Sequence, residues 1–300
     1  MKDYILHILR YFALFKHPLT PSELHLFLNT AATFEQLQME IEVLREEGEI
    51  VFHNGYLQRS KDENFSVLRD QKEKRALEMI EGSSIYTRII SKFPFVRSVL
   101  ISGSLSKLSA GPNADLDFFI VTAKDRLWTC RTLLHLFKKL TFITGHQNFF
   151  CMNYFVDEAH LSLPFESFYT ALELQTLIPV YGKTIYNRLK IENNWTSQYL
   201  PNHTGEPLVK ATEVITKSWI KGFIEMVLNL VFPKLINHWL MHLTDWKWRR
   251  KFSSLKLSEE EYDQAMLTRV DISKNHPHNF EKKVLEAMSD SDSVNQNVYV

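Results

Sequence analysis

The chain of 300 residues has little of three things that mark specialised proteins: cysteine, excess charge and long apolar runs. Only two cysteines occur, Cys130 and Cys151, which excludes a disulfide framework and favours reduced residues in apolar surroundings. The 35 Lys and Arg residues balance the 35 Asp and Glu residues, so no overall charge favours nucleic acid or acidic membranes.

The most apolar segments are also interrupted by charge. From Trp219 to Leu243, the residues Lys221, Glu225 and Lys234 break any run long enough to span a bilayer, and no targeting signal is evident at the N-terminus. We therefore expect a cytoplasmic protein without a membrane partner. Hydrophobic residues make up 45% of the chain and charged residues 23%, enough for the cores of two or three domains.

One stretch carries most of the chemical information. Gly103-Ser104 follows an apolar run, Val99–Ile101, and Asp115 and Asp117 open a second apolar run. A Gly-Ser turn that ends a strand and opens a helix presents unpaired N–H groups and a hydroxyl, which suits a phosphate. Residues i and i+2 of a strand point to the same face, so the two carboxylates predict an oxygen-rich seat for Mg²⁺.

Gly-Ser, a ten-residue spacer (105–114) and Asp-x-Asp between two apolar strands resemble the signature of the DNA polymerase β-like nucleotidyltransferase superfamily. The resemblance implies transfer of a nucleotidyl group from an NTP to an acceptor that the sequence does not identify. It implies that Asp115 and Asp117 are catalytic and bind one or two Mg²⁺ ions. Nucleotide binding would fall to Gly103, Ser104 and Lys107.

The chain departs from that signature in the third strand, predicted over 147–156. The superfamily commonly has a third carboxylate there, whereas this strand offers Asn153, with Asp157 and Glu158 only at its end. Asparagine can coordinate Mg²⁺ but is not a useful proton acceptor. Three alternatives stay open: Asp157 or Glu158 supplies the acid, the enzyme works with two aspartates, or the chain is an inactive nucleotide-binding or protein-interaction module.

The first sixty residues are expected to form a separate unit. Helices are predicted over 4–15, 22–28 and from the Thr33 cap to Glu47, and Asn54-Gly55 predicts a two-residue hairpin turn. This order resembles a winged helix-turn-helix domain (1–60). Its third helix, which would enter a DNA groove, has six glutamates and one arginine between Thr33 and Glu49. Such acidity disfavours DNA, so we expect a protein partner instead.

The sequence thus predicts an α+β protein: a winged-helix domain, a mixed nucleotidyltransferase sheet with flanking helices (61–200), a helical C-terminal domain (201–288) and a disordered tail (289–300). A helical connector (61–93) leads into the sheet, and its bases, from Arg69 to Arg75, are expected to be a solvated face or to reach phosphates.

Three further motifs are weak. Gly182-Lys183-Thr184 lacks the first glycine of a P-loop. The aromatic and basic cluster 246–251 either packs its tryptophans or stacks on a base. His276-Pro277-His278 is expected to begin a helix, because further metal ligands are missing.

Overall fold

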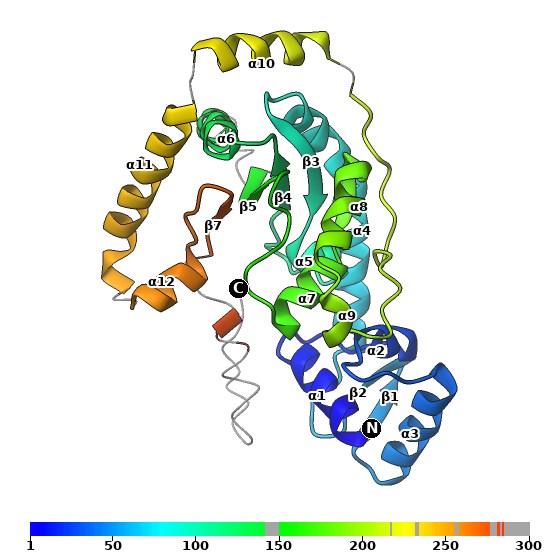
Figure 1. The fold of residues 1–300 in the computed structure, drawn as a ribbon. Coiled ribbons are helices and arrows are strands. Elements are labelled where there is room, and N and C mark those ends of the chain that lie inside the picture. The colour runs from blue at the N-terminus through cyan, green and yellow to red at the C-terminus, as the bar shows by residue number, and fades with distance from the viewer. Residues whose placement is uncertain are drawn as a thin grey trace.

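The computed structural model describes residues 1–141, 150–216, 218–231, 234–255, 258–276, 281, 282 and 284. It confirms the α+β class: a five-stranded mixed sheet is flanked by helices, and three helices and a two-stranded hairpin precede it (Figure 1). The segment predicted to be a disordered tail and the start of the predicted third strand, 147–149, lie outside the described residues.

The first unit has the element order that its local signals predict. Capping boxes at Thr20 and Thr33 begin the second and third helices. Asn54 and Gly55 have φ values of 51° and 84°, the left-handed pair that a two-residue hairpin turn requires. The elements are α1 (Lys2–Ala13), α2 (Pro21–Phe27), α3 (Phe34–Glu46), β1 (Ile50–His53) and β2 (Tyr56–Arg59).

Helix α4 (Ser66–Ser91) joins this unit to the sheet. Arg69 is buried and pairs with Glu23 of α2 at 2.7 Å, and it also donates to the Leu108 carbonyl. Arg75 donates to the Ala110 carbonyl at 2.9 Å. The expectation of a solvated or phosphate-binding face is therefore wrong for these two bases, which tie α4 to its neighbours.

The sheet has the strand order β6-β3-β4-β5-β7; β4 and β5 are parallel and the other pairs antiparallel. Alternate residues of β4 face different cores: Phe118 and Ile120 pack with Trp128, whereas Phe119 and Val121 join a core that continues into the first unit. The strands are β3 (Val96–Ile101), β4 (Asp117–Thr122), β5 (Cys151–Asp157), β6 (Ile178–Tyr181) and β7 (Ile272–Lys274).

Helices cover this sheet and its ends (Figure 1). The C-terminal part was expected to be helical. Its described residues also contain a strand, β7, which pairs with β5 at the sheet edge. The segment 208–216, expected to be helical, has no regular secondary structure, and the Val214 N–H donates to the Val180 carbonyl. The remaining helices are α5 (Gly103–Ser106), α6 (Leu127–Thr141), α7 (Phe168–Gln175), α8 (Lys183–Glu192), α9 (Thr196–Tyr199), α10 (Trp219–Val231), α11 (Lys234–Phe252), η3 (Ser253–Leu255) and α12 (Glu259–Ala265).

Among the helices in the described part of the chain, none combines the length and the hydropathy that crossing a bilayer requires.

Candidate functional site

The Gly-Ser turn and the second aspartate lie in contact at one end of the sheet. Gly103 begins α5 directly after β3, and the Ser102 N–H donates to the Asp117 carbonyl at 3.0 Å. Gly103 has a φ of 69°, and a Cβ atom there would lie 2.7 Å from Asp117 Oδ2. Its backbone conformation therefore favours glycine, and a side chain at this position would have to displace the Asp117 carboxylate. Ser104 follows in the first turn of α5.

The two aspartates flank a buried residue. Asp115 precedes β4 and Asp117 opens it, while Leu116 and Phe118 are 2% and 1% exposed. Burial raises the pKa of Asp117 to about 6, against the opposing effect of a hydrogen bond from Cys151, and the charges of Asp115 and Glu173 raise it further. The contributions of Asp115 and Glu173 show that further negative charge lies near Asp117, which favours binding of a cation.

Glu173 is an acid of this site that sequence reasoning did not assign to it. It lies on α7, and its Oε1 accepts from Lys107 Nζ at 2.7 Å; the same Nζ donates to the Gly103 carbonyl at 3.1 Å. Lys107, expected to bind nucleotide, therefore lies beside the Gly-Ser turn and is paired with a carboxylate. No local signal marks Glu173, because α7 reaches the site through tertiary packing such as the Ser106–Thr176 hydroxyl contact.

Two residues of β5 complete the surroundings of Asp117. Asp117 is in register with Cys151, and Asn153 Nδ2 donates to Asp117 Oδ1 at 3.2 Å and to Cys151 Sγ at 3.1 Å. Burial and the neighbouring Asp117 charge raise the pKa of the Cys151 thiol to about 12. Cys151 is thus a neutral hydrogen-bond donor to Asp117 rather than a nucleophile.

Asp157 and Glu158 do not reach the site, which rules out the alternative in which one of them supplies a third acid there. Asp157 is in register with Thr122, at the other end of β4 and roughly 17 Å from Asp117 by strand rise. Its carboxylate accepts from the Asp125 N–H at 2.6 Å and the Ala159 N–H at 2.8 Å. It therefore stabilises the turn after β4.

His276 follows the end of β7, the strand next to β5, and lies near the site. The neighbouring Asn275 N–H donates to the Asn153 carbonyl at 3.0 Å. Burial, with the charge of Lys274, lowers the pKa of His276 to about 4, although Glu173 opposes this shift. His276 is therefore neutral near pH 7. Its predicted companion His278 lies outside the described residues.

The donor set is compatible with Mg²⁺. Within the described ranges, no three His, Cys, Asp or Glu side chains are placed to hold a metal together. Mg²⁺ is usually bound by one or two carboxylates, with substrate phosphates and water as its other ligands, so Asp115 and Asp117 suit it.

The other motifs singled out in the sequence lie away from this site, and their residues take part in packing. A Cβ atom at Gly182 would lie 2.2 Å from the Arg97 carbonyl, which explains that glycine by close packing. Trp248 is buried beneath the Arg131 guanidinium, and Trp246 is exposed beside Arg250. The cluster 246–251 thus both packs and exposes tryptophan.

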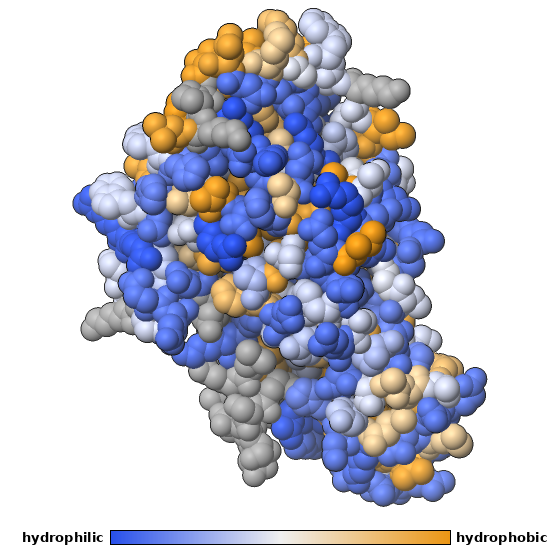
Figure 2. All heavy atoms as spheres, viewed as in Figure 1, coloured by the Kyte–Doolittle hydropathy of each residue, from blue (hydrophilic) through white to orange (hydrophobic). Residues whose placement is uncertain are grey.

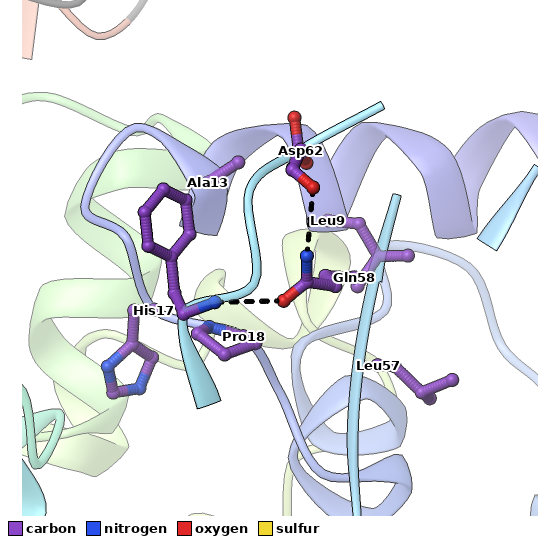
Figure 3. Close-up of a pocket in the computed structure, with 8 residues that line it drawn as sticks. Leu9, Ala13, His17, Pro18, Leu57, Gln58 and Asp62 are labelled. Atoms are coloured by element: carbon purple, nitrogen blue, oxygen red, sulfur yellow. Dashed lines mark hydrogen bonds between the residues drawn. The ribbon is translucent and has the colours of Figure 1, made fainter. Parts of the chain in front are cut away.

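A small pocket in the first unit is not a second site. It lies between α1 and β2, where Gln58 bonds to Asp62 and to the Phe65 N–H (Figure 3). Its volume of about 10 Å³ is on the scale of one water molecule. His17 lines it, and burial holds the pKa of His17 well below its usual value.

Comparison of the chain with protein-family models, curated proteins and solved structures gave no match.

Proposed function

We propose that this chain is a Mg²⁺-dependent nucleotidyltransferase similar to the DNA polymerase β-like superfamily. The observation that carries the proposal is the contact between the Gly103 turn and the Asp117 carboxylate, with Asp115 close enough to raise the pKa of Asp117. A phosphate bound at the turn would lie beside the carboxylates that hold its metal.

In this proposal, Asp115 and Asp117 hold Mg²⁺ and the backbone N–H groups at Gly103 and Ser104 orient the phosphates. Bound Mg²⁺ would neutralise charge on the phosphates and favour in-line displacement of pyrophosphate by an acceptor oxygen. Lys107 lies near enough to the turn to exchange Glu173 for a phosphate, since its Nζ already contacts the Gly103 carbonyl. Glu173 would then be released as a proton acceptor.

The direct test is a thermal-shift screen of the four NTPs with and without Mg²⁺. A ligand at 100 times its dissociation constant stabilises a protein by about 2.7 kcal/mol. We expect Mg²⁺-dependent stabilisation by at least one NTP, and its loss in Asp117→Asn, which removes a negative oxygen and little volume. Equal Mg²⁺-dependent stabilisation of the variant and the parent would contradict the role of Asp117.

One observation favours a second candidate, an inactive nucleotide-binding or protein-interaction module. Asn153 occupies the strand position near Asp117 where an acid is expected, and it donates to that carboxylate. Release of pyrophosphate distinguishes the enzyme from the inactive module. The module would bind NTP and Mg²⁺ but would release no pyrophosphate in the presence of any acceptor. Asn153→Asp should then raise the affinity for Mg²⁺ by adding a carboxylate.

The first unit is, under the same proposal, a winged helix-turn-helix domain that docks a protein rather than DNA. Its support is the acidity of α3, whose exposed side chains include Glu35, Glu42 and Glu46.

A further inference from the structure

Helix α10 is attached to the rest of the protein by its polar side. Lys221 Nζ donates to the Ser91 carbonyl at 2.9 Å, and Glu225 forms an ion pair with Arg97 at 2.8 Å. A surface helix normally turns its apolar side inward and its charges outward. In α10 this arrangement is reversed.

The outward side of α10 is a broad apolar surface. At about 100° per residue its exposed apolar side chains cover an arc of roughly 160°, opposite Lys221 and Glu225 and without a charged residue. Figure 2 shows most of this surface in orange and beige at the top of the molecule. The eight side chains, each at least 39% exposed, are Trp219, Ile220, Phe223, Ile224, Met226, Val227, Leu230 and Val231.

Together these side chains expose on the order of 900 Å², whereas the largest apolar patch of a typical monomer measures about 300–600 Å². None of the residues of α10 is buried. A surface of this size in water predicts that another phase or molecule covers it.

The shape of the surface favours a lipid interface over a second copy. The arc is a convex ridge on a single helix. Two such ridges pack about 8–10 Å apart along one stripe, which leaves the flanks of a 160° arc in water. A bilayer surface instead adapts to the whole arc.

The charges beside α10 favour anionic lipid. Arg88 and Lys92 are exposed on either side of Ser91, the residue that binds Lys221. In the sequence, Lys217 and Lys234 flank the helix at its two ends. Each base near an anionic membrane surface contributes about 1 kcal/mol of attraction.

We infer that α10 lies in the plane of an anionic membrane surface, with its apolar arc among the lipid head groups. Trp219 at its start suits the boundary between apolar and polar regions of a bilayer. The sequence expectation of no membrane partner was based on the lack of a spanning segment and on the zero net charge of the whole chain. A helix lying on the surface requires neither a spanning segment nor an overall positive charge.

Sedimentation of the full chain with vesicles tests the inference. Vesicles of phosphatidylcholine with phosphatidylserine should pellet the protein, and added salt should weaken binding. The double variant Phe223→Asp with Leu230→Asp should reduce the bound fraction about tenfold or more, because two exposed apolar anchors are lost. Met39→Asp with Val43→Asp, at exposed positions of α3 (63% and 47%), is the matched control and should bind like the parent.

A second pair of changes tests the charges. Arg88→Glu with Lys92→Glu should weaken binding to the phosphatidylserine vesicles severalfold. Failure of the parent to sediment with these vesicles would overturn the inference. A dimer in light scattering that the Phe223 and Leu230 variant abolishes would also overturn it, because a second copy would then cover the surface.

Discussion

Asp117 has a carboxylate whose charge destabilises the fold that holds it. Burial raises its pKa from the ordinary 3.8 to about 6. A carboxyl group with a raised pKa binds its proton more tightly in the folded chain than in the unfolded chain. Its favourable contribution to the free energy of unfolding is therefore complete below about pH 4 and is lost as the pH rises through about 6. Asp117→Asn mimics the neutral form. It should therefore raise the free energy of unfolding by about 1–3 kcal/mol near pH 7.5.

Urea unfolding of both proteins at several pH values checks this prediction, and the difference should shrink as the pH falls toward 4. A variant less stable than the parent at neutral pH would show that the carboxylate has stabilising partners instead.

Gly103 allows a second prediction at the scale of one residue. Gly103→Ala places a Cβ atom in a left-handed backbone conformation and 2.7 Å from Asp117 Oδ2. We expect a loss of about 1–2 kcal/mol in stability together with weaker Mg²⁺-dependent NTP binding. Gly111→Ala is the control, because a Cβ atom there meets nothing within 4 Å. Equal effects of the two changes in denaturation and thermal-shift experiments would contradict the close approach.

Among the elements, α6 begins with a cap supplied by another helix. Asn237 of α11 is 1% exposed, and its Oδ1 accepts from the N–H groups of Trp128 and Thr129 at 2.9 and 3.1 Å. Asn237→Ala would leave two buried donors unpaired. We expect a loss of about 1–3 kcal/mol, measured by chemical denaturation, whereas Asn237→Asp keeps an acceptor and should lose less. An equal loss of stability in Asn237→Asp and Asn237→Ala would contradict the capping role of Asn237.

The elements that the sequence predicts are those with local signals. Thr33 and the Asn54-Gly55 pair act within a few residues of themselves, so α3 and the hairpin follow from short segments. Strands β6 and β7 have four and three residues, and pairing with distant strands defines them. The same holds for the site: its Gly-Ser and Asp-x-Asp parts form one motif, whereas Glu173 arrives on a helix whose packing no short pattern encodes.

At the scale of the whole molecule, the acidity of the first unit predicts that the full chain binds DNA weakly. Its core is continuous with one face of the sheet, so the full chain is the object to test. Because the exposed charged side chains of α3 are three glutamates (Glu35, Glu42 and Glu46) against Arg45, we expect no duplex binding tighter than about 10⁻⁴ M at low salt. A fluorescence titration at two salt concentrations measures this. Tight binding that collapses as salt rises would make DNA the leading partner.

Helix α10 and the carboxylate site lie at opposite ends of the sheet. Glu225 of α10 accepts from the Phe95 N–H just before β3, whereas Asp117 lies beside the turn that follows β3. Strand β3 separates them by roughly 20 Å. A bilayer beneath α10 would therefore lie at about that distance from the carboxylates, so under the proposed function the acceptor of the nucleotidyl group would be a water-soluble molecule and not a lipid head group.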